Sequence, residues 1–232
     1  PLDGSAKRTA LITGGVHGGE DLAHWVMVGL LDYIMGASAE AQALRRRYKI
    51  LVYPMINAPG RAGGGWRGSW TQGTAGADDP NRHWHDVAGL EIVSKTKTAI
   101  AADIGTTAKD WSLDFHGYYP INFEIQSLAT DSVQARFVSL LGTNSGQTVN
   151  NVITYNAGYF NTYARDTLGF KLPLTAEHGD PVQHSDGVLA AYGAAMVPTL
   201  ATMAAEGAFG IVATPGNAVA AGITATITTA GV

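Results

Sequence analysis

The sequence predicts an α/β fold in which a mixed, mostly parallel, twisted sheet is flanked by helices on both faces. Short apolar runs that end in glycine or polar residues alternate with longer segments of helical periodicity, as in proteins built from strands and crossover helices. Hydrophobic residues make up 46% of the 232 residues, which supplies a sizeable core. No internal repeat or linker interrupts the pattern, and at roughly 100–200 residues per domain the length indicates one main domain.

The first half of the chain supplies two of the predicted strands and three of the predicted helices. Apolar runs bounded by turn residues indicate buried strands over residues 9–15 and 48–53. Apolar side chains at intervals of three and four residues predict helices over residues 20–35, 38–47 and 89–104. Between the second strand and the third helix, residues 57–85 form a long loop rich in glycine and tryptophan, and a loop of that length is usually functional.

The second half continues the alternation of strands and helices. The same criteria predict strands over residues 111–116, 123–128 and 171–177. Helices are predicted over residues 131–141 and 160–168, followed by a long alanine-rich helix over residues 186–205. Weak alternation over residues 221–232 suggests a terminal edge strand.

The composition excludes several classes of protein. With 15 Lys and Arg against 19 Asp and Glu, the chain has a net charge of −4 and lacks the basic surface of a nucleic-acid binder. Its small net charge and normal apolar content exclude intrinsic disorder. The absence of cysteine excludes disulfides and thiolate chemistry, so any metal must be held by histidines and carboxylates.

The C-terminal part of the chain is nearly free of charge. Between residues 187 and 232 the only charged residue is Glu206, but Pro198, Pro215 and many glycines interrupt the stretch. A buried helix followed by a Gly/Thr-rich tail therefore fits better than a membrane span. The chain starts at Pro1, which suggests a processed product or part of a longer polypeptide, and the sequence leaves the cellular compartment open.

Polar residues follow several predicted strands at the edge of the sheet where α/β proteins bind their ligands. His17 follows the first strand, and Glu20 opens the next helix three residues later, so both side chains can converge. His116 ends another strand, and Asn57 and Glu177 follow two more. Two histidines and a carboxylate are the ligands of a catalytic zinc site, which keeps a fourth position open. The sequence therefore predicts one zinc ion per chain.

Four motifs occur in a characteristic order: H-x-x-E at residues 17–20, D-P-N-R at 79–82, D-F-H at 114–116 and T-A-E at 175–177. In this order they resemble zinc carboxypeptidases of the carboxypeptidase A superfamily, over residues 10–179. The first motif is also similar, more weakly, to the aspartoacylase and succinylglutamate desuccinylase branch. The resemblance implies a carboxypeptidase-like catalytic domain over residues 1–210, with residues 211–232 as a C-terminal tail.

The resemblance also implies roles at the metal. His17, Glu20 and His116 would be the zinc ligands, and Asp79 would orient a ligand histidine, as metal-bound imidazoles generally require. Glu177 would be the general base that takes a proton from zinc-bound water and passes it to the leaving amine.

Further residues would contact the substrate. Asn81 and Arg82 would bind its terminal carboxylate, because a guanidinium pairs with a carboxylate through two hydrogen bonds. Tyr155, which lies 22 residues before Glu177 as the family's substrate-capping tyrosine does, would close over the substrate. Arg67 would stabilise the developing oxyanion, and Arg61 in the same loop is the alternative.

Other polar residues receive weaker interpretations. Glu124, which follows the start of a predicted strand, is the rival candidate for the base if its carboxylate faces the pocket. His83 and His85 resemble metal ligands but fit better as loop residues beside the site, and His178 fits better as a residue that lines the cleft than as one that tunes Glu177. Thr162 stands where the family tunes its side-chain pocket, and because it is not acidic it does not indicate a preference for basic terminal residues.

The predicted function is that of a zinc metallopeptidase, a hydrolase that removes a C-terminal amino acid from a substrate with a free carboxylate. One alternative is an N-acyl amino acid deacylase of the aspartoacylase or desuccinylase type, which shares the same metal chemistry. A second alternative is a non-catalytic structural domain of a larger assembly, with contacts made through the nearly uncharged tail.

Overall fold

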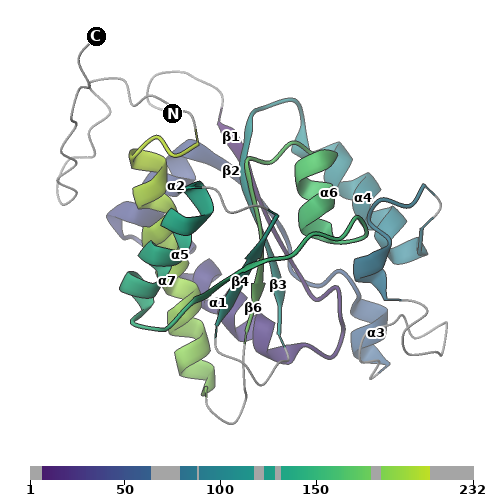
Figure 1. The fold of residues 1–232 in the computed structure, drawn as a ribbon, viewed down its shortest axis with the longest axis horizontal. Helices are drawn as coiled ribbons and strands as arrows, with labels where there is room; N and C mark the ends of the chain where they lie inside the picture. Colours follow the sequence, from purple (N-terminus) through teal and green to yellow (C-terminus); the bar gives the residue numbers. More distant parts are fainter. Residues whose placement is uncertain are drawn as a thin grey trace.

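A six-stranded sheet lies between two layers of helices in the computed structural model (Figure 1). The structure describes residues 7–63, 79–87, 89–117, 123–128, 132–178 and 184–209. The spatial order of the strands is β2-β1-β3-β6-β4-β5. Neighbouring strands run parallel, except that β4 and β6 are antiparallel. The predicted mixed, mostly parallel sheet is therefore confirmed. The strands span Arg8–Gly14 (β1), Tyr48–Tyr53 (β2), Lys109–His116 (β3), Glu124–Ser127 (β4), Asn150–Ile153 (β5) and Leu172–Glu177 (β6).

Helices cover both faces of the sheet, as Figure 1 shows. One layer contains α1, α2, α5 and α7, and the other contains α3, α4 and α6. Each layer buries its own apolar cluster against the sheet. The α-helices span Asp21–Met35 (α1), Ala39–Arg47 (α2), Ala58–Ala62 (α3), Glu91–Ile104 (α4), Ser132–Ser145 (α5), Phe160–Asp166 (α6) and Asp186–Ala205 (α7).

Local capping interactions account for two helix boundaries. The Ser38 hydroxyl accepts a hydrogen bond from the Ala41 N–H at 3.1 Å, so α2 begins directly after Ser38. Ser185 caps α7 in the same way through the N–H of Val188. The predicted bounds of α7, residues 186–205, agree with the structure.

Two elements differ from the sequence prediction. The helix α3 lies inside the predicted loop, and the Asn57 side chain caps it by accepting a hydrogen bond from the Gly60 N–H at 3.0 Å. The strand β5 was not predicted, because its sequence Asn-Asn-Val-Ile has no apolar alternation; its backbone pairs with β4 at the sheet edge. Residues 64–78 of the predicted loop and the tail 211–232, with its predicted edge strand, lie outside the described residues.

The helix α7 is apolar around most of its circumference because it packs between other elements. Gly29 of α1 and Gly193 of α7 let the two helix backbones approach closely, since a Cβ at either position would collide with a carbonyl of the other helix. By length and composition α7 could cross a membrane, as could α1 and α2 together if counted as one bent span, but 61% of the most apolar window of α7 is buried inside the fold. The predicted buried helix describes it well.

Replacing Gly193 with alanine is expected to destabilise the fold. The added methyl group would meet the Val26 carbonyl, and overpacking a close contact typically costs about 1–3 kcal/mol. Urea unfolding followed by circular dichroism measures the change in the free energy of unfolding. Gly187→Ala is the matched control in the same helix, because its Cβ would meet only the Ser185 hydroxyl at 3.9 Å. Equal stability of the two variants would contradict the close packing of α1 on α7.

The two faces of β3 are both buried but differ in polarity. Trp111, Leu113 and Phe115 pack into the apolar cluster on the α1 and α7 side. Because side chains alternate along a strand, Asp114 and His116 point to the opposite face, where α6 lies. The face toward α6 therefore carries buried polar groups, with Asp114 and His116 near the carboxyl end of β3.

Candidate active site

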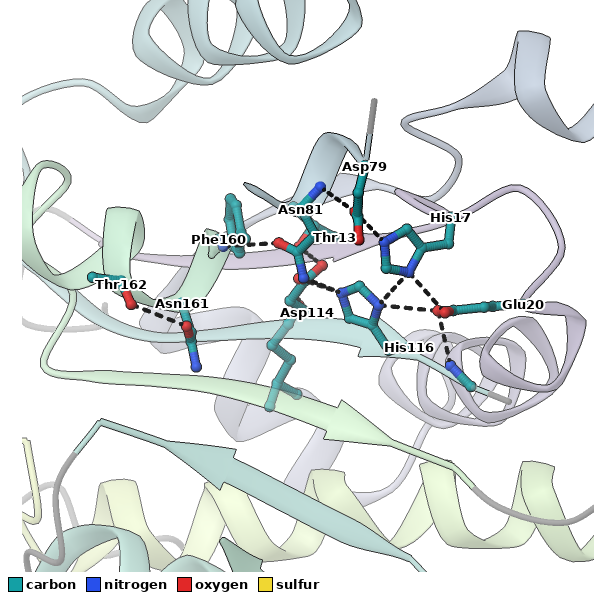
Figure 2. A network of polar contacts seen from close by, with 12 residues as sticks. Thr13, His17, Glu20, Asp79, Asn81, Asp114, His116, Phe160, Asn161 and Thr162 are labelled. Carbon is teal, nitrogen blue, oxygen red and sulfur yellow. Dashed lines mark hydrogen bonds and ion pairs between the residues drawn. The ribbon is translucent and has the colours of Figure 1, made fainter. Parts of the chain in front are cut away.

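Three predicted metal ligands converge at the carboxyl ends of β1 and β3 (Figure 2). Gly15 adopts a φ of 65°, a left-handed conformation that turns the chain sharply after β1 and leads into His17. Glu20 directly precedes α1, and His116 ends β3. One ligand atom from each of the three side chains lies within 4.8 Å of the others, and all three residues are buried.

The donor atoms of these three residues, called the metal group below, face one another at distances that one metal ion can bridge. His116 Nδ1 lies 3.2 Å from His17 Nδ1 and 3.0 Å from a carboxylate oxygen of Glu20, whose other oxygen lies 2.7 Å from His17 Nδ1. Two imidazole nitrogens that face each other need a proton on one of them or a cation between them. Two histidines and one glutamate suit zinc, and the donor set therefore fits the predicted metal.

Each histidine also contacts an aspartate through its second ring nitrogen, Nε2. His17 Nε2 lies 2.7 Å from Asp79 Oδ1, and His116 Nε2 lies 2.8 Å from Asp114 Oδ2. A histidine that binds a metal through Nδ1 carries its proton on Nε2, which then donates to the aspartate. Thr13 donates a hydrogen bond of 2.7 Å to the second oxygen of Asp114 and fixes its orientation.

Sequence reasoning singled out Asp79 but missed the contact of Asp114 with His116. A signal was present in the sequence, because Asp114 precedes His116 by two residues in the same strand. Side chains at that spacing lie on one face, so an aspartate there can reach the ring of the histidine.

The buried charges shift one another's pKa values strongly. Burial alone would raise the pKa of Glu20, but the charges of His116 and His17 and hydrogen bonds to both rings hold it well below its usual range. Burial opposes protonation of His116, yet Asp114 and Glu20 raise its pKa well above the ordinary value. Burial would likewise raise the pKa of Asp79, but its hydrogen bond with His17 and the charges of His17 and Arg82 lower it to about 2.

Zinc affinity is expected to fall as the pH decreases. Because the pKa values of His17 and His116 are raised, both rings hold protons tightly in the metal-free protein, and zinc must displace those protons to bind Nδ1. The apparent affinity should therefore drop by about tenfold per pH unit for each displaced proton. Zinc titration with a competing chelator between pH 5 and pH 8 measures this slope, and an affinity independent of pH would contradict the assignment.

Replacing Asp114 with asparagine is expected to weaken zinc binding by about 10–100-fold, as losing a carboxylate behind a ligand histidine typically does. The amide keeps the shape of the side chain, and Thr13 can still contact it, so the fold should remain intact. Chelator competition gives the zinc dissociation constant, and thermal unfolding of the metal-free protein checks the fold. Unchanged affinity would show that Asp114 does not act on His116.

Asn81 and Arg82 lie in a short turn beside the start of α6. Asn81 Oδ1 accepts a hydrogen bond of 3.0 Å from the Phe160 N–H, and its Nδ2 lies 3.3 Å from His116 Nε2. The Arg82 guanidinium lies 3.4 Å from Asp79 and 4.5 Å from the centre of the Tyr159 ring. The side chain of Arg82 is 39% exposed, so a substrate can reach it.

The segment that carries Tyr155 packs directly on this turn. Gly158 touches the Arg82 backbone so closely that a Cβ would collide with its carbonyl, and the Gly158 carbonyl accepts a hydrogen bond of 3.1 Å from the Trp84 N–H. Tyr155 itself is 61% exposed, and the Arg165 guanidinium lies 5.5 Å from the centre of its ring. The predicted capping tyrosine is thus at the surface, in the same segment as the Gly158 that contacts the predicted carboxylate-binding turn.

The two candidate oxyanion arginines differ in what the structure describes of them. Arg61 lies on α3 beside the metal group, where its guanidinium forms an ion pair with Asp21 and donates to the Gly18 carbonyl at 3.3 Å. Arg67 lies outside the described residues. The choice of Arg67 over Arg61 therefore stays a prediction.

Glu177 ends β6, directly in register with His116 on the neighbouring strand. Burial raises its pKa; the charges of Glu20 and Glu124 act in the same direction, and those of His116 and His17 act against it. A carboxylate with a raised pKa, one strand away from a metal site, has the properties of a general base. Its role as the base remains a prediction.

The remaining predicted polar residues lie apart from the metal group. His83 Nδ1 contacts Asp86 at 2.5 Å, and the ring of His85 lies 5.9 Å from that of Tyr163. His178 is fully buried among aromatic rings, and burial lowers its pKa to about 3. The positions of His83 and His85 agree with their interpretation as loop residues, whereas His178 belongs to the core and not to the lining of a cleft.

The similarity of this chain to known proteins agrees with a metal site at these residues. The sequence model of the zinc carboxypeptidase family matches residues 2–156. The chain belongs to the zinc carboxypeptidase family. The predicted family, with its metal-dependent hydrolases, is therefore confirmed. The match includes the three residues of the metal group and the turn at Asn81, and it ends before Glu177.

Named relatives of this zinc carboxypeptidase family member are longer proteins. Cytosolic carboxypeptidase 2 of Mus musculus is 33% identical over 120 residues, which is 51% of this chain and 13% of that protein. Cytosolic carboxypeptidase 1 of Xenopus laevis is 41% identical over 75 residues, or 32% of this chain and 6% of that protein. The aligned part of the chain thus spans less than a fifth of these relatives.

Solved structures share the fold of this family member at low sequence identity. The metallo-carboxypeptidase from Burkholderia cenocepacia superposes with a TM-score of 0.73 at 22% identity, over 88% of this chain and 59% of that chain. Murine aminoacylase 3 superposes with a TM-score of 0.57 at 15% identity, over 86% of this chain and 66% of that chain. The fold is therefore common to peptidases and to at least one protein named as an acylase.

Proposed function

We propose that this chain is the catalytic part of a zinc metallocarboxypeptidase that removes the C-terminal residue of a peptide. The observation that carries the proposal is the convergence of His17, Glu20 and His116, with Glu177 in register on the next strand. An idle pocket has no physical need to bury two histidines and a glutamate around one point, because burying charge is costly unless it serves binding or catalysis.

A zinc ion would be held by the Nδ1 atoms of His17 and His116 and by the Glu20 carboxylate. Zinc bound there would supply an acidified water and polarise the scissile carbonyl. Glu177 would accept a proton from the attacking water and donate it to the leaving amine, a role that its raised pKa favours. Asp79 and Asp114 keep the ligand rings oriented through their Nε2 atoms.

Arg82 binds the terminal carboxylate of the substrate. Its guanidinium is partly exposed and lies in the turn that packs against α6, close to the metal group through Asp79. Asn81 would assist Arg82 in binding this carboxylate. Its Oδ1 already accepts a hydrogen bond from the Phe160 N–H, which holds the turn in place. Tyr155 covers the bound substrate, and Arg67, or Arg61 as the alternative, stabilises the oxyanion.

A panel of substrates tests this function. Peptides with a free C-terminal carboxylate, the same peptides with a C-terminal amide and N-acyl amino acids are incubated with the zinc-loaded chain. We expect release of the C-terminal residue from the free peptides and at least a tenfold lower rate on the amides, because the bond to Arg82 is lost. Hydrolysis of the acyl amino acids alone would favour a deacylase, and no hydrolysis with zinc bound would favour a non-catalytic domain.

A further inference from the structure

One short turn joins the metal group to the proposed carboxylate site. Asp79 precedes a 3₁₀ turn, Pro80–Arg82, and its side chain accepts a hydrogen bond of 2.9 Å from the Asn81 N–H (Figure 2). Pro80 is buried at the start of the turn, where its ring fixes the backbone dihedral φ. Asp79 and Arg82 therefore lie at the two ends of a conformationally restricted turn.

Asp79 contacts a predicted metal ligand on one side and Arg82 on the other. Its Oδ1 lies 2.7 Å from His17 Nε2, and its Oδ2 lies 3.4 Å from Nη1 of the Arg82 guanidinium. Asp79 and His17 are only 5% and 3% exposed. Because little water screens charges at such buried positions, a change of charge at Arg82 acts on His17 through the carboxylate between them.

The charge of Arg82 works against metal binding when no substrate is bound. A carboxylate that accepts the Nε2 proton of a ligand histidine makes the ring a better donor to the metal. At 3.4 Å the guanidinium offsets part of the negative charge of Asp79, and it adds a positive charge near a site for a dication. A substrate carboxylate that pairs with Arg82 neutralises the guanidinium, so the full charge of Asp79 then acts on His17.

We propose that Asp79 transmits the charge at Arg82 to the metal group, so that a carboxylate bound by Arg82 and a zinc ion bound by the metal group strengthen each other's binding. This proposal rests on the proposed function, in which Arg82 binds the terminal carboxylate, and adds a regulation of the same site. The two binding steps must affect each other by the same factor, because coupling free energies are reciprocal. The chain would therefore hold its zinc most tightly while a substrate is present.

Zinc affinities of Arg82 variants test the proposal without any turnover. Removing the charge in Arg82→Gln should strengthen zinc binding by about five- to tenfold, in the lower part of the usual range for coupled sites, because the Arg82 side chain is partly exposed. Arg82→Lys, which keeps the charge, should bind zinc as the wild-type chain does. Arg165→Gln is the matched control and should also leave the affinity unchanged, because Arg165 is similarly exposed, at 38%, and pairs with Asp166 on α6.

Chelator competition gives each zinc dissociation constant, and thermal unfolding of the metal-free proteins checks the fold. Unchanged or weaker zinc binding by Arg82→Gln would overturn the proposal. Equal strengthening in Arg82→Lys would overturn it as well, because that variant keeps the positive charge.

A double-mutant cycle tests whether Asp79 is the link. Asp79→Asn alone should weaken zinc binding, because His17 loses its carboxylate. In the Asp79→Asn chain, the further change Arg82→Gln should alter the zinc affinity by less than about twofold, since the link is already lost. The full effect of Arg82→Gln in that background would show that Arg82 acts without Asp79, and it would overturn the proposal.

Isocaproate and isocaproamide separate this coupling from the proposed function, because they share one shape and only isocaproate carries a carboxylate. Isocaproate should tighten zinc binding by the wild-type chain by about five- to tenfold but leave Arg82→Gln unaffected, and isocaproamide should change neither. Tightening that persists in Arg82→Gln would mean that the carboxylate binds zinc directly, and it would overturn the coupling. If Arg82→Gln binds zinc more tightly but isocaproate has no effect on the wild-type chain, the link through Asp79 stands and only the carboxylate site of the proposed function fails.

Discussion

Replacing His116 with alanine is expected to lower the zinc content of the purified chain from about one ion per chain to near zero. His116 contributes one of the three converging ligand atoms, and the two that remain, from His17 and Glu20, leave the ion with incomplete coordination. Elemental analysis after dialysis against buffer with trace zinc measures the content. The thermal unfolding of both metal-free proteins shows whether the variant is folded.

A second histidine provides the control for this experiment. His83 contacts Asp86 in the loop and does not belong to the metal group, so His83→Ala should keep its zinc. A wild-type chain without metal after zinc is supplied would exclude the zinc hydrolase assignment. Equal zinc loss in both variants would show that the ion was held elsewhere or non-specifically.

Replacing Glu177 with glutamine is expected to reduce turnover by about 10²–10⁴-fold while zinc remains bound, as removal of a general base typically does. The amide has nearly the same shape but cannot accept the proton of the attacking water. Glu177 is not part of the metal group, so the zinc content should stay at the wild-type value. Stopped assays on a free peptide give kcat, and elemental analysis gives the zinc content of the same sample.

Two further variants determine which carboxylate is the base. Glu40→Gln makes the same chemical change in the first turn of α2, on the opposite face of the sheet, and should keep the wild-type rate. If Glu124→Gln lowered the rate on a neutral peptide as much as Glu177→Gln does, and Glu177→Gln had little effect, then the rival base candidate would hold that role.

Most of the fold followed from local patterns in the sequence. The strands β1, β2, β3 and β6 are runs with a strong apolar pattern. The helices α1 and α2 have helical periodicity with acidic or serine-capped starts, and α7 is a long alanine-rich run that begins after a serine cap. The edge strand β5 carries no such pattern, because hydrogen bonds of its backbone with β4 are sufficient to hold it. The helix α3 is short and begins at the Asn57 side-chain cap, a local signal that periodicity does not reveal within a glycine-rich loop.

The candidate site was predicted where its residues follow strands or carry a motif. His17, Glu20 and His116 are all of this kind, and the structure brings them together. The contact of Asp114 with His116 depends on side-chain orientation within one strand, and was missed. The position of Glu124 could not be predicted from strand ends, because β4 runs antiparallel to β6 and its first residue therefore lies opposite Glu177.

The close fit of Gly158 against the Arg82 backbone has a consequence for protein engineering. The segment that carries Tyr155 and the turn that carries Arg82 cannot be exchanged separately, because either one from another protein would have to reproduce this backbone contact. A chimera that aims at a new substrate should therefore transplant residues 79–84 and 155–160 as a single cassette. Libraries should leave position 158 as glycine and vary only the side chains around it.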